Sequence, residues 1–254
     1  MDRSDEMRGR TMIKGRASSA SRLFGRGPDG VRRVLGVPLD LRGLTEPHAR
    51  LRAFEPENPS LLVPRAVGVG WDLNIGAVAA KLGLIRPDDS LPDLEQHIPD
   101  RVSTMLTMAP LGGAAVVASL GALVGRSESS LPSNWSLTFR PSSWVSAPRA
   151  VAVPVVLSVA AGAWAAAESL RHRGGARPQG PEVTASAQAL GLQTMSAVLI
   201  MASKRAAEQP ERRSLLALGG LIAFPAVSTA VLVGTVRAAL SDLDRSLRQD
   251  GRRA

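Results

Sequence analysis

The chain has 254 residues, contains no cysteine and carries a formal net charge of +9, most of it from arginine. The absence of cysteine excludes disulfides, thiolate catalysis, zinc–thiolate sites and iron–sulfur clusters. Aromatic residues make up 3% of the chain and tyrosine is absent, so few side chains can stack on single-stranded nucleic acid. The bias toward alanine, arginine and glycine over lysine is typical of a high-GC bacterial genome, and we expect an actinobacterial source.

Residues 1–52 predict a disordered basic tail. They hold twelve Arg or Lys and six Asp or Glu among Gly, Ser and Pro, with too few large apolar residues to offset the entropy cost of ordering. The tail is either a solvated arm or an arm held near anionic inner-leaflet lipids, where each basic residue contributes about 1 kcal/mol. A third interpretation is a tethered nucleic-acid binder, but the tail has no recognisable motif for it, so nucleic acid is not an expected partner.

Residues 53–100 predict a small, irregular cytoplasmic or interfacial module. Prolines interrupt its apolar stretches, and the longest stretch, 66–84, contains Asp72, Asn74 and Lys81. At the centre of a spanning helix a charged residue costs about 2.5–3.5 kcal/mol, whereas each Leu or Val returns about 0.3–0.6 kcal/mol. We therefore expect the stretch around Trp71 to lie at the inner membrane surface and not across the bilayer.

Residues 101–237 predict a transmembrane bundle of about four helices. A spanning helix needs about 20 apolar residues to cross about 30 Å of hydrocarbon. Four runs contain no charged residue, and they cover 102–125, 150–167, 183–203 and 214–236. The second run is long enough if Trp164 and Glu168 lie at the membrane interface. The third is marginal, because it contains Gln188, Gln193 and several Ser and Thr.

Small residues recur at four-residue spacing in all four runs. Helices in lipid associate by close backbone approach, so such residues mark the faces that touch. The sets are Gly121 and Gly125; Ser158, Gly162 and Ala166; Ala187 and Gly191; and Ala226, Ala230 and Gly234. The expected fold class is an all-α, multi-pass membrane bundle, without an assignment of which helices pair.

The distribution of Arg and Lys predicts that both termini are cytoplasmic. With the N-terminus inside, twenty-four basic residues lie on the inner side and seven on the outer side, in line with the positive-inside rule. The loop after the third run places four basic residues outside, within 204–213. Either the N-terminal bias overrides this loop or the third segment is re-entrant. We favour the former, because a re-entrant segment would put the basic tail outside. Residues 238–254 predict an amphipathic helix on the inner surface.

Side chains suited to catalysis or metal binding are few and scattered. The three histidines, His48, His97 and His172, are far apart and are expected at the surface. No phosphate-binding loop and no helix with paired histidines occurs. The acidic residues between Asp88 and Asp100 match no calcium loop and predict a solvated linker. We therefore expect no catalytic residue, no cofactor and no metal site, and we interpret the chain as not an enzyme.

A more specific pattern lies in residues 54–74, which read FEPENPSLLVPRAVGVGWDLN. This stretch resembles a bacterial domain of unknown function, family 5808 of that series. The family pattern runs aromatic, Asn-Pro, acidic, Asp-Pro, Val-Pro-basic, Gly-x-Gly-Trp and Asn. Asn58 stands where the family has Asp, and Glu55 where it often has Asn. The motif is either an interfacial packing motif or a ligand site, and its candidate residues are Pro64, Arg65, Gly68, Gly70, Trp71 and Asn74.

A second pattern lies in residues 131–144, which read LPSNWSLTFRPSSW. It is similar to a loop in an uncharacterised membrane family that accompanies immunity proteins of the sporulation-delaying toxin type. That loop reads Ile-Pro-x-His-Trp, then Gly-x-Pro-Asp-x-Trp, and the positions in register are Pro132, Trp135, Pro141 and Trp144. The His, Gly and Asp of the loop are replaced by Asn134, Phe139 and Ser142. The resemblance therefore implies a loop bracketed by Trp135 and Trp144 between the first two spans, without an inherited activity.

Together these observations predict a non-enzymatic integral protein of the cell membrane, of the accessory, sensing or immunity kind. The bilayer is its expected partner, and a second membrane protein or another copy of the chain is a further one. The alternative is a permease or channel for a small neutral solute. It rests on three prolines within the spans and on a pair of polar side chains, namely Pro110, Pro154, Pro225, Gln188 and Gln193.

Overall fold

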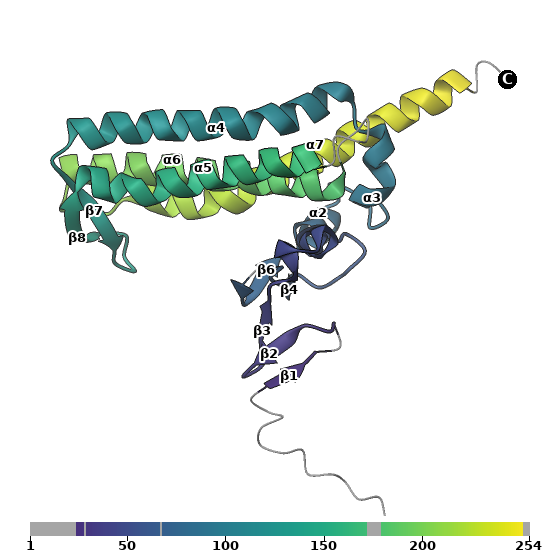
Figure 1. Cartoon of the computed structure of the whole chain (residues 1–254), viewed down its shortest axis with the longest axis horizontal. Coiled ribbons are helices and arrows are strands. Elements are labelled where there is room, and N and C mark those ends of the chain that lie inside the picture. The colour runs from purple at the N-terminus through teal and green to yellow at the C-terminus, as the bar shows by residue number, and fades with distance from the viewer. Residues whose placement is uncertain (1–23, 28, 67, 172–178, 251–254) are drawn as a thin grey trace, which may run out of the picture.

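Four long antiparallel helices form the body of the molecule in the computed structural model, which describes residues 24–27, 29–66, 68–171 and 179–250 (Figure 1). Each is long and apolar enough to cross a membrane, and together they contain the four predicted runs. They are α4 (Asp100–Ser127), α5 (Ala147–Arg171), α6 (Gly180–Glu208) and α7 (Leu215–Asp250). The marginal third run is helical throughout, so the four-helix prediction is confirmed at the level of helix length and composition.

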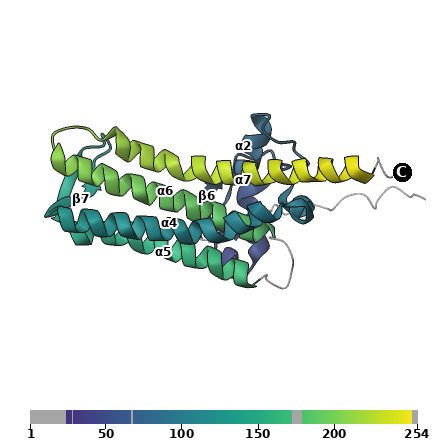
Figure 2. The same ribbon diagram turned by 90° about the horizontal axis from the view of Figure 1, so that it is seen from above.

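Helix α6 is the central helix of the bundle. It packs against α4, α5 and α7, and Figure 2 shows it between α4 and α7 when the bundle is seen from above. Half of its most apolar window is buried, compared with 22–28% in the other three helices. The Ser, Thr and Gln residues that made this run marginal as a span therefore lie mostly among neighbouring helices, where they can bond to protein groups instead of facing lipid.

The glycines of the small-residue sets lie at close helix contacts, with one exception. A Cβ added at Gly121 would meet Val155, and one added at Gly162 would lie 2.8 Å from the Pro110 carbonyl oxygen. A Cβ added at Gly191 would lie 2.7 Å from the carbonyl oxygen of Phe224 on α7. These contacts assign the pairs that the spacing left open, α4 with α5 and α6 with α7. Gly234 faces open space instead.

A single amide ties three helices together in the middle of the bundle. Gln193 of α6 is 3% exposed, and its Nε2 donates to the carbonyl oxygen of Pro110 on α4 at 2.7 Å and of Ser158 on α5 at 3.2 Å. Interhelical hydrogen bonds of this kind stabilise helix pairs in membranes by about 0.6 kcal/mol on average. Gln193 is therefore a structural residue of the bundle.

The N-terminal part of the chain is a small mixed module rather than an extended tail. Four antiparallel strands follow the order β1-β2-β3-β5, and β4 pairs with β6. The strands are β1 (Phe24–Arg26), β2 (Arg32–Val34), β3 (Val37–Asp40), β4 (Leu62–Pro64), β5 (Gly68–Val69) and β6 (Trp71–Leu73). The helices are η1 (Arg42–Leu44), η2 (Pro47–Phe54), α2 (Ile75–Lys81), α3 (Leu91–Leu94) and η3 (Glu95–His97), where η denotes a 3₁₀ helix.

This module differs from the expected disordered tail over 1–52 and from a purely helical fold. Residues 1–23 of that tail lie outside the described part of the chain. The strands β2 and β3 are joined by Leu35 at φ 52° and Gly36 at φ 82°, a two-residue hairpin turn that needs positive φ at both positions. Leucine at such a position is uncommon, so the turn carried no signal in the sequence.

The module and the bundle share one hydrophobic core. Phe54, Ile75 and Leu91 of the module belong to the same buried cluster as Val183 of α6 and Val236 of α7. In Figure 1 the module extends sideways from one end of the bundle, where η2 packs against α6 while α2 and α3 pack against α7. The module and the bundle therefore form one continuous packed unit. The end of the bundle that carries the module is called the module end, and the opposite end is called the far end.

The far end of the bundle carries a β-hairpin. Strands β7 (Ser130–Trp135) and β8 (Pro141–Ser146) connect α4 to α5, at the opposite end of the bundle from the module (Figure 1). The turn contains Phe139 at φ 57°, and its carbonyl oxygen accepts a 2.9 Å bond from the Ser214 N–H. The loop expected between the first two spans is thus an ordered hairpin that reaches the start of α7.

The amphipathic helix expected over 238–254 is present up to residue 250 as the last turns of α7, and residues 251–254 lie outside the described part of the chain. Helix α7 continues without a break to Asp250. Leu240 and Leu243 pack against the shared core, whereas Leu247 is 62% exposed. The leucine stripe is therefore used partly to hold the module against α7, which explains its helical spacing.

We expect Gly191→Ala to destabilise the bundle and Gly234→Ala to leave it intact. The new methyl at 191 would crowd Ser228 and Phe224, and overpacking of this kind costs about 1–3 kcal/mol. Nothing lies within 4 Å of a Cβ at 234, and Ala in a helix interior is favoured over Gly by about 0.5–1 kcal/mol. Thermal unfolding of the two variants in detergent measures the difference, and equal midpoints would contradict the α6–α7 contact.

Candidate functional site

Asn74 is the structural centre of the motif at 54–74. It is fully buried, and its Nδ2 donates to the carbonyl oxygens of Glu55, Asn58 and Ser60 at 2.9–3.2 Å. Its Oδ1 accepts from the N–H of Glu55 at 3.0 Å and from that of Ala77 at 3.2 Å, where it caps α2. One side chain thus provides hydrogen-bond partners for the backbone of a proline-rich loop, whose N–H and C=O groups are not paired in regular secondary structure.

The hairpin β4–β6 has two chemically different faces. Leu62 pairs with Leu73 and Pro64 with Trp71, and these residues share one face because side chains alternate along a strand. That face is exposed although it is apolar, with Leu62 61%, Trp71 43% and Leu73 42% exposed. On the other face Val63 is buried.

The ends of this hairpin are set by Gly68 and Gly70. Their φ angles are +105° and +102°, which a residue with a side chain rarely adopts. The turn brings Arg65 to Asp72, and Arg65 Nε lies 3.0 Å from Asp72 Oδ1. The ion pair neutralises the aspartate that argued against a spanning helix. The stretch forms strands and a seven-residue helix, none long enough to cross a bilayer.

A cavity of about 360 Å³ separates this hairpin from the bundle. It combines cations, one carboxylate, an amide and two aromatic rings. Its lining comprises Gly43, Arg50, Arg65, Ala66, Asp72, Trp164, Gln188 and Phe224. The structure therefore brings the motif residue Arg65 together with Gln188, a polar residue of the third predicted run.

A buried ion pair forms one wall of this cavity and joins the module to the bundle. Arg50 of η2 lies 2.8 Å from Glu168 Oε2 on α5, with the two side chains 7% and 1% exposed. Arg50 also donates to the Gly43 carbonyl oxygen at 2.6 Å. Its guanidinium lies 4.8 Å from the centre of the Trp164 ring. Breaking such a buried pair by removing one partner costs about 3–5 kcal/mol, because the other charge remains buried.

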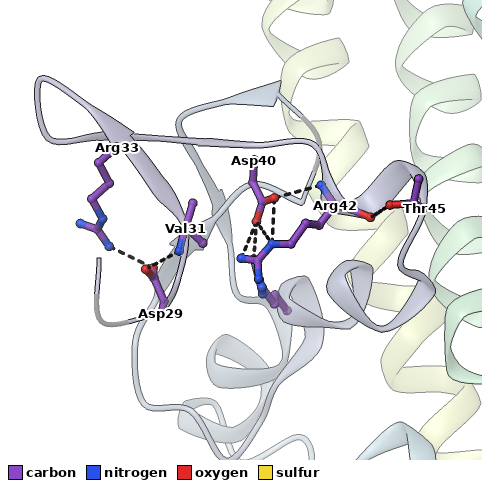
Figure 3. A network of polar contacts seen from close by, with 7 residues as sticks. Asp29, Val31, Arg33, Asp40, Arg42 and Thr45 are labelled. Atoms are coloured by element: carbon purple, nitrogen blue, oxygen red, sulfur yellow. Dashed lines mark hydrogen bonds and ion pairs between the residues drawn. The ribbon is translucent and has the colours of Figure 1, made fainter. Parts of the chain in front are cut away.

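A second carboxylate organises the sheet side of the module (Figure 3). Asp40 is buried, and it pairs with Arg42 at 2.9 Å and Arg52 at 2.8 Å. Burial alone would raise the pKa of Asp40, but the hydrogen bonds from the Arg42 side chain and backbone and from Arg52 outweigh it. The pKa of this carboxyl is therefore held well below its usual range, and Asp40 stays ionised at neutral pH.

The acidic residues between Asp88 and Asp100 do not form one cluster, because Asp89 and Glu95 bond to different backbone groups. Asp89 is buried and accepts from the Arg86 N–H at 2.7 Å. Glu95 accepts from the Gly180 N–H at 2.6 Å, where a carboxylate stabilises the start of α6 through the helix dipole. Among the described residues, no group of three or more His, Cys, Asp or Glu could hold a metal ion. Asp88, Asp93 and Asp100 are exposed, in line with the solvated linker expected here, whereas Asp89 and Glu95 bond to backbone N–H groups.

The residues expected in the two motifs lie at opposite ends of the molecule. Pro64, Arg65, Gly68, Gly70, Trp71 and Asn74 are in the module, whereas Trp135 and Trp144 are in the far hairpin. In that hairpin Trp144 pairs with Pro132 and is 41% exposed. Of the three histidines, His97 is partly buried, while the His48 side chain and His172 lie outside the described residues. The two tryptophan motifs therefore do not form one site.

Sequence reasoning missed the residues at the junction. Arg50 belongs to a segment whose charge predicted a solvated arm, and Glu168 was expected at the interface without a partner. The available signal was the position of Glu168, a lone carboxylate immediately after a charge-free run and four residues after Trp164. A buried or interfacial carboxylate of this kind needs a cation. Arg171, three residues later, was the local candidate and does pair with Glu168 at 3.5 Å, whereas nothing in the sequence pointed to Arg50.

The comparisons support the first family resemblance. The model of a family described as Family of unknown function (DUF5808) matches residues 56–81, a short part of the chain that covers both strands of the hairpin, Asn74 and α2. No curated protein and no solved structure matches the chain. The similarity of residues 131–144 to the second membrane family stays a prediction.

We expect Asn74→Asp to open the motif loop. The substitution replaces the Nδ2 donor by an acceptor that faces three carbonyl oxygens, and unsatisfied buried polar groups cost about 1–3 kcal/mol each. Limited proteolysis in detergent should then cleave within 55–61 faster than in the wild type. Asn134→Asp, which alters an exposed amide bonded to Ser143, is the matched control and should leave this cleavage unchanged.

We expect Asp40→Asn to weaken the module at neutral pH and to flatten its acid sensitivity. Because the pKa of Asp40 is lowered on folding, its stabilisation is fully present above the unfolded pKa of about 3.9 and is lost as the pH falls toward the folded pKa. Hydrogen exchange of β3 and η1 at pH 7 and under acid measures this. Asp88→Asn, at an exposed position, is the control, and equal behaviour of both variants would contradict the role of Asp40.

Proposed function

We propose that this chain is a non-enzymatic integral membrane protein of the accessory, sensing or immunity kind, whose module rests on the inner leaflet. The observation that supports the proposal is the exposed apolar face of β4–β6, on a module fastened to the bundle by the Arg50–Glu168 pair. An exposed apolar hairpin in water invites aggregation, whereas at a membrane surface it buries its leucines and keeps the Trp71 indole N–H wet.

The depth of the hairpin relative to the helices supports contact with lipid. The cavity places Arg65 and Asp72 beside Trp164. Trp164 precedes the end of α5 at Arg171 by seven residues, which is about 10 Å along the helix axis. The 25 residues of α5 extend for about 37 Å, only slightly more than the ~30 Å hydrocarbon thickness. The hairpin therefore lies beside the last two turns of α5, close to the end of the helix that emerges from the bilayer in this proposal.

The proposal includes a cell-membrane location with both termini in the cytoplasm. The module and the last turns of α7 lie at the same end of the bundle (Figure 1), as an even number of spans requires. Twenty-four of the thirty-one basic residues belong to that end in this topology, and the positive-inside rule assigns it to the cytoplasm. A second membrane protein or another copy of the chain remains the proposed protein partner.

The alternative of a permease for a small neutral solute has one specific observation in its favour, since Gln188 lines the cavity at the module end. The polar groups deeper in the bundle are engaged in packing. Gln193 donates to two helices, and Ser228 donates to the Ala187 carbonyl oxygen at 3.1 Å. Uptake of a labelled neutral solute by proteoliposomes would favour the alternative over the accessory role.

The test of the proposed function uses the absence of native cysteine. Single cysteines replace Leu73, on the apolar face, and Glu57, on an exposed polar position of the same module. With an environment-sensitive fluorophore at each position, spin-labelled lipids in nanodiscs should quench the probe at 73 severalfold more than the probe at 57. Equal quenching, with free access of a polar maleimide to both positions, would show that the hairpin faces water and would refute the proposal that the module rests on the inner leaflet.

A further inference from the structure

A basic pocket lies at the far end of the bundle, between the end of α6 and the start of α7. Its volume is about 290 Å³. Three arginines from two segments surround it, and the lining comprises Arg205, Gln209, Arg212, Arg213, Ser214, Leu215 and Leu216. These arginines belong to the loop whose charge opposes the positive-inside rule. The positive-inside rule does not explain why arginines gather on the outer side in the predicted topology, and the pocket itself offers an explanation.

The three arginines have no acidic partner in the part of the chain that the structure describes. The ion pairs there involve other arginines, and Glu208 and Glu211 of the same loop form none with them. Arg50 at the module end is by contrast buried and paired with Glu168. The pocket therefore concentrates positive charge that no carboxylate of the described residues neutralises through an ion pair.

The backbone around the pocket adds to this positive field and is held in place. Helix α7 begins at Leu215, and the first N–H groups of a helix lack partners within the helix and carry a partial positive charge. Ser214 fixes this helix start by bonding to the Ala217 N–H and to the Phe139 carbonyl oxygen of the far hairpin. Phe139 lies in the β7–β8 turn with a positive φ of 57°, and its own N–H bonds to the Ser136 carbonyl oxygen of that turn at 2.9 Å.

We propose that this pocket binds a phosphate group. The guanidinium fork matches the geometry of phosphate oxygens and forms paired, charge-assisted hydrogen bonds with them, and a helix start is a favourable place for an anion. Three arginines and the first turn of α7 together offer several hydrogen-bond donors to one phosphate group in the pocket. The site is independent of the proposed role of the module, which lies at the opposite end.

A lipid headgroup is the source of phosphate that the surroundings favour. A stripe of exposed apolar side chains begins at the pocket and runs along α7 toward the middle of the bundle, formed by Leu215, Leu218, Leu221 and Ile222. An acyl chain can lie along this stripe while the phosphate occupies the pocket. A soluble phosphate would contact only the pocket, whereas a phospholipid would also contact the apolar stripe. This difference allows an experiment to distinguish the two sources.

The test compares two full-length variants that lose the same charge. The pocket variant carries Arg205→Gln, Arg212→Gln and Arg213→Gln. The control variant carries Arg101→Gln, Arg245→Gln and Arg248→Gln, at exposed positions of the module end. Purified protein in a phosphate-free neutral detergent is titrated separately with phosphatidylglycerol, with phosphatidylcholine and with inorganic phosphate. Thermal stabilisation and lipid adducts in native mass spectrometry are the two measurements, and monodisperse elution verifies the fold of each variant.

The proposal predicts that the wild type binds at least one phosphate-bearing probe and that the pocket variant binds it about tenfold more weakly, the equivalent of one strong charge-assisted contact. The control variant should retain wild-type binding within about twofold. Stabilisation by the lipids but not by inorganic phosphate identifies a headgroup as the source, and stabilisation by inorganic phosphate identifies a soluble one. Absence of binding to all three probes, or equal losses in the two variants, would overturn the proposal.

Discussion

The buried ion pair between Arg50 and Glu168 is the constraint on which the arrangement of the two parts of the molecule depends. Neither charge can be left alone in that environment, since an unpaired buried charge costs several kcal/mol. Glu168 of α5 pairs with Arg50 of η2 at 2.8 Å and with Arg171 of its own helix at 3.5 Å, so Arg50 is the cation that ties this carboxylate to the module. The pair holds η2 against α5, while the core residues of the module pack against α6 and α7.

The bundle follows a related rule, because lipid cannot solvate a polar group. The polar side chains of α6 are directed at neighbouring helices, with Gln193 as the clearest example. Thr184 and Thr194 donate instead to carbonyl oxygens one turn earlier in their own helix. The close approach at Gly162 and Gly191 then contributes dispersion contacts between backbones, which drive helix association in a membrane. The outward faces are left apolar.

The two ends of the bundle have different chemistry, and this difference gives the molecule its functional polarity. The module end presents a flat apolar hairpin beside a cavity lined by Trp164 and paired arginines. The far end presents an arginine pocket whose charges have no acidic partner among the described residues. Both features lie at ends of the four apolar helices, so both of the proposed membrane contacts fall at the ends of the bundle.

The sequence by itself identified the four helices that could cross a membrane, because length and absence of charge decide this whatever a helix packs against. It also identified the motif at 54–74 and argued against a span there, since the free-energy cost of inserting Asp72 into a bilayer depends on that residue alone. It predicted that small residues would mark helix contacts, but Gly234 shows that spacing alone does not identify which contacts form.

Only the tertiary structure decided the rest, and the physical reason is the same in each case. Pairings over long sequence distances, such as Arg50 with Glu168, leave no periodic pattern in the chain, and neither does the convergence of Arg65 and Gln188 on one cavity. The strands of the module are short and turn at Leu35, a residue that rarely adopts positive φ, so composition alone indicated disorder. Arg50 and Glu168 would be solvated in an unfolded chain, and they form an ion pair because the fold buries both side chains together. Which residues are buried depends on the whole fold.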